Sequence, residues 1–416
     1  MHIDCLPLTN DVSLSHDYSS KVIYSAVADC LFVYNKNKNQ YVPWACKEYQ
    51  IMNNDKTFGL TIRDDLVFHD NTPVTIADYY ECFKTFLASE NYVRYYLDEI
   101  KKIELSENRL LFHLNRRNKY FFQKLSAYFL AVYKLEENKK TYSGPYEIYK
   151  RENNGLYLKR CPFYRIKLNN AENQNIHVVE IQDKNPLKKF KKESIDLTCN
   201  TYFLNEDAYK TENLNIINNN IFVSLIIVSD EIDKTTRQII SCVLNKEIIV
   251  KPIANIADIA NDYFVDSNLN ELKCNRRIKT LNLELTIGFT NYYPNELIVD
   301  SIIELLEKVN IRLKKKKLLL GDTENCDLLL HLGYPDYHNN IAIYDSFFIK
   351  YLIKSVKYNK YVNTYLVSPS PELLSEINKT LLCEAKIIPL LKFKSMHLAS
   401  PLFSIFNFIE FNFFDL

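Results

Sequence analysis

The sequence predicts an α/β protein with more than one lobe, and three features of the chain carry this prediction. At 416 residues the chain is longer than one hydrophobic core usually supports, so two or three compact units are expected. Runs that alternate apolar and polar residues, at 57–62, 100–114 and 281–289, recur between runs with helical spacing. A hydrophobic content of 47% with 25% charged residues is typical of a folded rather than a disordered chain.

The stretch 56–87 contains the densest set of local signals. Residues 57–62 alternate as in a half-buried strand, and the short apolar piece 66–68 predicts a second strand. The polar run 69–73 favours a tight turn, and Thr75 lies three residues before Asp78, which is the spacing of a capping box. Apolar and aromatic residues then recur at helical spacing: Ile76, Tyr79, Tyr80, Phe83, Phe86 and Leu87. The stretch therefore predicts strand, turn, second strand, tight loop and capped helix.

This order of elements, with these residues, resembles the signature of the family-5 solute-binding proteins, the peptide- and nickel-binding receptors of ABC importers. The residues shared with that signature are Leu60, Arg63, Phe68, His69, Asp70, Pro73, Thr75, Ala77 and Asp78. The chain departs from it at Asn71, where the family usually has glycine. Because asparagine tolerates positive φ better than most residues, we expect the turn to survive.

Further landmarks of the family follow in the same order along the chain. They are a helix leading into 31–34, a Pro-containing element at 41–45, a hairpin at 99–114, a Gly-Pro turn at 142–148, a strand at 156–164, an apolar strand at 221–228, a helix at 297–308 followed by Asn310 in place of glycine, and a strand at 326–334. The run 221–228 is apolar throughout, which predicts a central strand buried on both faces. The resemblance thus covers essentially the whole chain.

The resemblance implies a two-lobed fold like that of periplasmic binding proteins, of type II and cluster C, with an extra small lobe inserted in the first lobe. We expect the first lobe to comprise residues 1–225 and 386–416, with the small inserted lobe at about 46–140. We expect the second lobe at 226–385. The ligand would then lie between the lobes, which close on it by a hinge motion.

The sequence offers no catalytic or metal-binding motif. It lacks a P-loop, a Gly-rich dinucleotide turn, a G-x-S-x-G motif and an H-E-x-x-H motif, and its six glycines are too dispersed to form one. The eight histidines never recur at i, i+4. We therefore expect no enzyme activity, no cofactor and no metal. The net charge of +1 gives no reason to expect nucleic acid as a partner.

The spacing of the cysteines and the first residues of the chain indicate where in the cell the protein is expected to work. No two of the ten cysteines lie within four residues, so no zinc-binding pair is present and unpaired, buried thiols are expected. The run 1–7 lacks the basic and apolar regions of a secretory signal, and no 18-residue apolar run predicts a membrane span. As encoded, the chain is expected to work in the cytoplasm, although the family is usually periplasmic or on the cell surface.

The resemblance points to one ligand-binding stretch, Gly333-Tyr334-Pro335-Asp336-Tyr337. In peptide receptors of the family, an aspartate after a Gly-aromatic pair accepts the ligand's α-ammonium. Asp336 is the candidate for this role, with Tyr334 and Tyr337 beside it. A carboxylate in a closed cleft pairs with an ammonium more strongly than at a surface. The alternative is that Asp336 only begins a turn.

The expected function is therefore a solute-binding protein of an ABC importer. It would bind a peptide or similar small solute as a monomer and hand it to the permease. The alternative is a cytosolic ligand-sensing domain, related to the solute-binding part of helix-turn-helix regulators of sugar-phosphate stress. No DNA-binding module is recognisable in the sequence, and no residues support an enzyme built on this scaffold.

Overall fold

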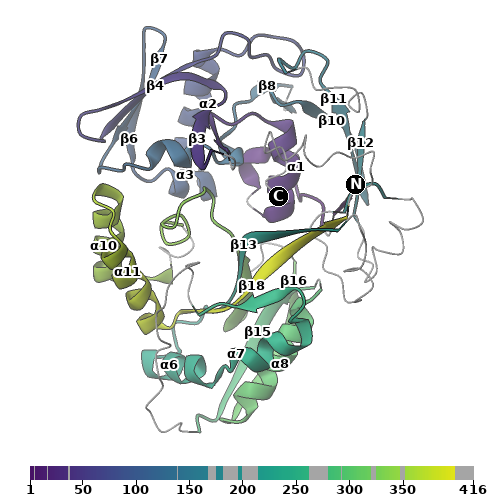
Figure 1. The fold of residues 1–416 in the computed structure, drawn as a ribbon, viewed down its shortest axis with the longest axis vertical. Coiled ribbons are helices and arrows are strands. Elements are labelled where there is room, and N and C mark those ends of the chain that lie inside the picture. The colour runs from purple at the N-terminus through teal and green to yellow at the C-terminus, as the bar shows by residue number, and fades with distance from the viewer. Residues whose placement is uncertain are drawn as a thin grey trace.

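The chain folds into two lobes placed one above the other along the long axis of the molecule (Figure 1). The computed structural model describes residues 1–3, 5–15, 17–35, 38–137, 139–166, 175–180, 195–198, 214–261, 280–291, 293–319, 325–346 and 352–398. We call residues 1–198 the first lobe and residues 214–398 the second lobe. The domain limits expected from the sequence stay a prediction, as does the small inserted lobe, and residues 399–416 lie outside the described part.

The first lobe carries two four-stranded sheets and two ribbons. Its elements are β1 (His2–Ile3), η1 (Val12–Leu14), α1 (Tyr18–Val27), β2 (Phe32–Asn35), β3 (Gln40–Pro43), β4 (Cys46–Met52), β5 (Thr57–Ile62), α2 (Ile76–Ala88), α3 (Tyr92–Tyr96), β6 (Ile100–Ser106), β7 (Arg109–Leu114), α4 (Phe121–Lys124), η2 (Tyr128–Leu130), β8 (Lys134–Glu136), β9 (Lys139–Thr141), β10 (Tyr146–Glu152), β11 (Gly155–Arg160) and β12 (Ile176–Glu180). The described strands pair in the orders β1-β12-β11-β10 and β4-β5-β7-β6, with ribbons β2-β3 and β8-β9.

The second lobe is built on a six-stranded sheet of order β14-β18-β13-β17-β15-β16. Its elements are β13 (Leu214–Ile227), α6 (Lys234–Val243), α7 (Lys246–Val250), η4 (Lys251–Ile253), β14 (Ala257–Ile259), β15 (Leu283–Thr290), α8 (Asn295–Glu307), β16 (Ile311–Leu318), β17 (Leu328–Gly333), α10 (Val356–Val367), α11 (Pro371–Glu384) and β18 (Ile387–Leu398). Strands β15, β16 and β17 run parallel, while β13 is antiparallel to both β17 and β18.

Strand β13 is buried on both faces, as its apolar run predicts. Ile221, Val223 and Leu225 belong to the hydrophobic core that also contains residues of α7 and α8. Phe222 and Ile226, which alternate with them, belong to the core shared with the first lobe and with α10 and α11. Since successive side chains of a strand point to opposite faces, β13 joins two cores across one sheet.

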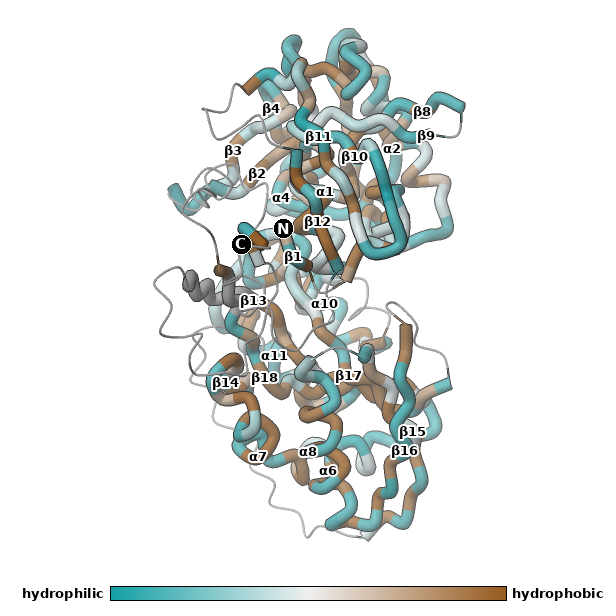
Figure 2. Tube along the Cα trace, turned by 90° about the vertical axis from the view of Figure 1, so that its right-hand side faces the viewer, coloured by the Kyte–Doolittle hydropathy of each residue, from teal (hydrophilic) through white to brown (hydrophobic). Residues whose placement is uncertain are grey.

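Two long strands of the second lobe, β13 and β18, extend toward the first lobe (Figure 1). At the end of β18, Leu398 accepts a hydrogen bond from the backbone N–H of Thr198 (2.9 Å) and donates one to the Thr198 hydroxyl (2.8 Å). Thr198 also bridges to His2 of β1. The tube in Figure 2, turned by 90°, shows the same join in the middle of the molecule.

The signature stretch folds largely as its local pattern predicts. Thr75 and Asp78 form the capping box at the start of α2, and Asn71 adopts a φ of 66°, so the turn survives the loss of glycine. The second strand expected at 66–68 is wrong. Val67 makes one isolated bridge to Pro73, because the chain reverses within the tight turn before a ladder can form.

Two landmarks that are distant in sequence touch in the structure. The partly buried imidazole of His69 donates from Nε2 to the carbonyl oxygen of Gly144 (3.1 Å), and the N–H of Gly144 donates to the carbonyl oxygen of Val27 at the end of α1 (2.9 Å). Burial lowers the pKa of His69 to about 4, so the ring is neutral near pH 7. Hydrogen bonds through Gly144 thus connect the loop at 69–73 to helix α1.

The expectation that all cysteines are unpaired is wrong at Cys242, which is disulfide-bonded. Free thiols are present at Cys5, Cys30, Cys46, Cys82, Cys161, Cys326 and Cys383. Composition alone could not distinguish these two states, because pairing depends on which distant residues the fold brings within reach.

Within the described ranges, no helix combines the length and apolar character that a membrane crossing requires.

We predict that Gly144→Ala destabilises the protein, because an added Cβ would lie 2.3 Å from the Val27 carbonyl carbon. Overpacking of this kind costs about 1–3 kcal/mol, and the neighbour here is backbone, which cannot rotate away. The matched control is Gly155→Ala, whose Cβ would first meet the end of the His177 side chain at 3.0 Å. Urea unfolding should show the larger loss for Gly144→Ala; equal midpoints for both variants would contradict the close-packing role of this glycine.

Candidate functional site

The three residues singled out by the sequence follow directly on strand β17. This strand lies between β13 and β15, near the middle of the sheet, and ends at Gly333. In open α/β sheets, ligands bind beyond the carboxyl ends of the strands. Tyr334, Asp336 and Tyr337 therefore lie at the end of the sheet that carries binding sites in such folds.

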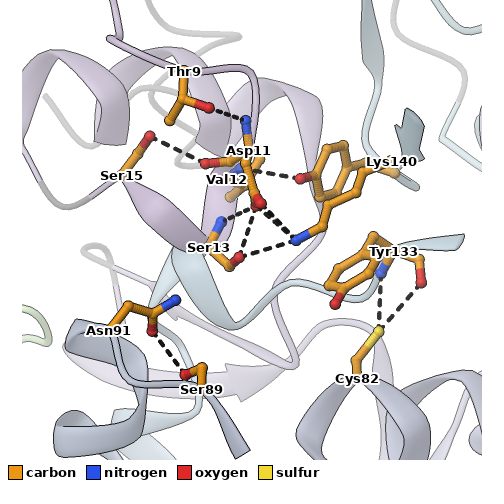
Figure 3. Close-up of polar contacts among 11 residues, drawn as sticks. Thr9, Asp11, Val12, Ser13, Ser15, Cys82, Ser89, Asn91, Tyr133 and Lys140 are labelled. Atoms are coloured by element: carbon orange, nitrogen blue, oxygen red, sulfur yellow. Dashed lines mark hydrogen bonds and ion pairs between the residues drawn. The ribbon is translucent and has the colours of Figure 1, made fainter. Parts of the chain in front are cut away.

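Asp336 is held by a hydrogen bond from the first lobe. The Tyr92 hydroxyl donates to Oδ2 of Asp336 at 2.6 Å, across 244 positions of sequence. Tyr92 begins the short helix α3, which Asn91 caps by accepting from the N–H of Val93 (3.1 Å). The Ser89 hydroxyl in turn donates to the same Asn91 side-chain oxygen (2.9 Å), as Figure 3 shows. These two hydrogen bonds fix the backbone at the start of α3 and thereby the position of the Tyr92 side chain.

The environment of Asp336 disfavours its charge. The Asp336 side chain is half-buried, so part of its surface is accessible to solvent. Burial raises the pKa of its carboxyl to about 6, against the lowering effects of the Tyr92 hydrogen bond and of the Lys21 and Lys124 ammonium groups. A carboxylate in this state gains from any cation that enters beside it.

Tyr334 lies beside a lysine of the first lobe. The Lys21 ammonium is 5.2 Å from the centre of the Tyr334 ring, and Lys21, Tyr92, Tyr334 and Asp336 are all partly accessible. An ammonium within about 6 Å of a ring face is attracted by its quadrupole. The site therefore combines a carboxylate, a phenol, an aromatic ring and a cation drawn from both lobes.

Helix α1, which carries Lys21, is fixed at its start. The Asp17 side chain caps it by accepting from the N–H of Ser20 (2.8 Å). In the preceding turn, the Lys140 ammonium lies 2.8 and 2.7 Å from the two carboxylate oxygens of Asp11, which also accepts from Ser13 (Figure 3). These contacts hold the first-lobe wall of the site in place.

Tyr337 is more deeply buried than its two neighbours. It is 4% exposed and belongs to the core shared with the first lobe. Its hydroxyl has no hydrogen-bond partner among the described residues. A buried hydroxyl without a partner costs about 1–3 kcal/mol, so a polar group supplied by a ligand or water would stabilise it.

The residues after Tyr337 are held by the first lobe. The ring of His338 stacks on Tyr34 with centroids 3.8 Å apart, and its backbone N–H donates to the Tyr41 hydroxyl. The Asn339 side chain then donates to Gln123 at 3.1 Å. Ring stacking and hydrogen bonds thus attach the loop after β17 to the β2-β3 ribbon and to α4.

A buried ion cluster anchors the far end of this loop. The ammonium of Lys124, in α4, lies 3.1 Å from Glu99 of the first lobe and 3.2 Å from Asp345 of the second, and all three side chains are almost fully buried. Burial by itself would lower the pKa of Lys124, but the two carboxylates outweigh it and the pKa is raised. Lys124 therefore stays charged and joins the two lobes electrostatically.

The three residues singled out by the sequence lie on the second-lobe side of the candidate site, and their role stays a prediction; sequence reasoning did not anticipate the first-lobe residues beside them. Tyr92 and Lys21 carry no motif, and their relation to Asp336 arises only from folding. A capping Asn91 before an aromatic helix indicates a helix start, not a ligand site. No group of three or more His, Cys, Asp or Glu side chains in the described ranges is placed to hold a metal ion.

Comparison with known proteins identifies a family and a fold. Residues 40–271 match the family described as bacterial extracellular solute-binding proteins, family 5. No curated protein sequence matches this chain.

Several solved structures superpose on both lobes. The binding protein AgaA of Agrobacterium tumefaciens R10, solved with agropinic acid, has a TM-score of 0.82 at 14% identity, covering 99% of this chain and 96% of its own. The Escherichia coli murein tripeptide binding protein MppA has a TM-score of 0.82 at 14% identity, covering 96% and 93%. NikA of Staphylococcus aureus, solved with Ni(L-His)2, has a TM-score of 0.77 at 16% identity, covering 96% and 95%. These likenesses confirm the two-lobed α/β fold.

We predict that Lys124→Met destabilises the protein strongly, because Glu99 and Asp345 would lose the buried cation that they share, although Arg116 still lies 3.6 Å from Glu99. Breaking a buried pair by removing one partner costs about 3–5 kcal/mol. The control is Lys84→Met, which removes an exposed lysine paired with Glu81 at 3.0 Å and should cost about 0–1 kcal/mol. Differential scanning calorimetry compares the two; equal melting temperatures would show that the cluster does not tie the lobes.

Proposed function

This chain belongs to family 5 of the bacterial extracellular solute-binding proteins, and from that premise we propose that it binds a short peptide or a similar amine-bearing solute between its lobes. In this proposal Asp336 accepts the ammonium group of the ligand, while Tyr334 and Tyr337 line its path. The protein then delivers the solute to the permease of an ABC importer.

One observation supports this proposal above the others, namely the state of Asp336. Its pKa of about 6 reflects a carboxylate whose charge is poorly compensated by its surroundings. Tyr92 engages Oδ2, so the second carboxylate oxygen remains available to a further donor. A ligand ammonium would supply both a hydrogen bond and the missing positive charge.

The partnerless hydroxyl of Tyr337 gives a second, weaker support. A peptide carries carbonyl oxygens and N–H groups next to its ammonium, and one of these would satisfy the phenol. The solved structures of similar fold include complexes described as containing agropinic acid or Ni(L-His)2. Both of these bound molecules are small and polar, as the proposed solute would be.

The alternative function, a ligand-sensing domain of a transcriptional regulator, receives no support. None of the similar structures reported above is described as a regulator. An anionic ligand such as a sugar phosphate would also face the carboxylate of Asp336, which repels it.

We predict that Asp336→Asn weakens the binding of a small peptide with a free amine by about 2–5 kcal/mol, the usual cost of breaking a desolvated charge pair. Without ligand, the melting temperature should stay level or rise, because burial already disfavours the carboxylate. Calorimetric titration with a peptide panel measures the first effect, and Asp64→Asn, an exposed residue of the first lobe with 78% of its side chain accessible, is the control. Unchanged peptide affinity in Asp336→Asn would remove this residue from the site.

We also predict that peptide affinity falls as the pH drops through about 6. The raised pKa means that the Asp336 carboxyl takes up a proton there, and the neutral acid cannot pair with an ammonium. Below that value affinity should fall by up to about tenfold per pH unit, as one proton is displaced on binding. Titrations between pH 7.5 and 5 test this, with Asp336→Asn as the reference for the titration of all other groups. A slope shared by both proteins would assign the effect elsewhere.

A further inference from the structure

A buried carboxylate of the first lobe is only half hydrogen-bonded. Asp29 lies just after α1 and is 3% exposed, and its Oδ1 accepts from the Trp44 indole N–H and from the Tyr164 hydroxyl, both at 2.9 Å. Its other oxygen, Oδ2, has no hydrogen-bond partner within the described residues. Buried polar atoms of native proteins are nearly always paired with protein or with ordered water. Oδ2 therefore points to a donor that the described side chains do not supply.

An arginine with unsatisfied N–H groups contacts the same two aromatic side chains. The Arg165 guanidinium lies 4.5 Å from the centre of the Trp44 ring and 5.8 Å from that of Tyr164. Its Nε and Nη2 are buried, and neither has a hydrogen-bond partner in the part of the chain that the structure describes. The charge of Arg165 also acts on Asp65, but that carboxylate already accepts two hydrogen bonds from Arg63, each at 2.9 Å. Asp65 therefore leaves the inner N–H groups of Arg165 unpaired.

Asp29 and Arg165 act on each other without direct contact between their unsatisfied atoms. Burial raises the pKa of Asp29 to about 6, and the largest opposing effect is the positive charge of Arg165. Oδ2 of Asp29 and Nε and Nη2 of Arg165 nevertheless make no hydrogen bond with each other. Because the Trp44 indole contacts both groups, the carboxylate and the guanidinium lie close together.

The chemistry of these atoms selects what could satisfy them. An anion would be repelled by the carboxylate of Asp29, and a cation by the guanidinium of Arg165. Water is neutral, and it can donate to the carboxylate while it accepts from the guanidinium. Burial, and next the charge of Asp29, raise the pKa of Tyr79, whose fully buried hydroxyl also has no partner within the described residues. A buried water molecule typically makes about three hydrogen bonds, and these three side chains offer that number.

We propose that a buried water molecule bridges Asp29 and Arg165, donating to Oδ2 of the carboxylate and accepting from Nε or Nη2 of the guanidinium. This site is separate from the candidate ligand site and does not rest on the proposed function. A hydrogen bond through water is nearly as favourable in enthalpy as a direct one. The water would connect the end of α1 to the segment after β11, beside the Trp44 ring that both charged groups contact.

The test is a crystal structure of the full chain, at a resolution that shows ordered water, for wild type and for Arg165→Met. Wild type should show one fully occupied water within about 2.6–3.2 Å of both Asp29 Oδ2 and an Arg165 nitrogen. In Arg165→Met this water should be lost or displaced, because one of its partners is gone. Arg63→Met removes the neighbouring, partly exposed guanidinium and should keep the water.

Urea unfolding supplies a second measurement on the same pair. Trp44 is the only tryptophan of the chain, so its fluorescence follows unfolding at this site and shows that each variant is folded. The double variant Asp29→Asn/Arg165→Met should lose less stability than the sum of the two single variants, because the single changes each leave one partner of the bridge unpaired.

Several results would overturn the proposal. A direct hydrogen bond between Asp29 Oδ2 and Arg165, an ion in place of the water, or no density between the two groups in wild type would each do so. A water that keeps its place in Arg165→Met would show that Asp29 holds it alone. Additive losses of stability in the single and double variants would likewise contradict a bridge. The wild-type structure decides the question even if Arg165→Met does not fold.

Discussion

The ion cluster of Lys124, Glu99 and Asp345 is the constraint on which the rest of the structure depends. One buried ammonium is shared between a carboxylate of the first lobe and one of the second. Glu99 is also 3.6 Å from Arg116 and accepts from Asn118, whereas the pair of Lys124 with Asp345 crosses between the lobes. The loop that ends at Asp345 therefore cannot leave the first lobe without breaking a buried ion pair. Asp336 lies near the other end of that loop, and its position relative to Tyr92 follows from this anchor. The loop is thus fixed at both ends, by the ion pair of Lys124 with Asp345 and by the hydrogen bond from Tyr92 to Asp336.

Strand pairing in the sheet of the second lobe determines where the loop after β17 begins. β17 runs next to β13, whose alternating side chains belong to two different cores. A strand so fixed on both faces cannot shift its register, since a slip of one residue would move every side chain to the wrong core. Gly333 pairs with Phe222 at the edge of this ladder, and Tyr334 is the first residue to leave it. Packing far from the site therefore determines where its aromatic ring and carboxylate lie.

Local features of the fold were predictable from sequence, and contacts between distant segments were not. The capping box of Thr75 and Asp78 and the positive φ of Asn71 depend on a few neighbouring residues, so the pattern identifies them. The strand expected at 66–68 failed because apolar residues alone do not show whether a partner strand is within reach. Asp336 could be singled out only through resemblance to a family. Its partner Tyr92 lies 244 positions away, and no pattern in the sequence pairs them.

The most direct test of a solute site between the lobes is a crystal structure of the protein grown with the dipeptide Ala-Ala. The expected result is electron density for one molecule that contacts Asp336 of the second lobe and Tyr92 or Lys21 of the first. A dipeptide held by one lobe alone would contradict the central claim. So would density in the separate pocket of about 350 Å³ beside Arg237 and Lys354, which lies within the second lobe.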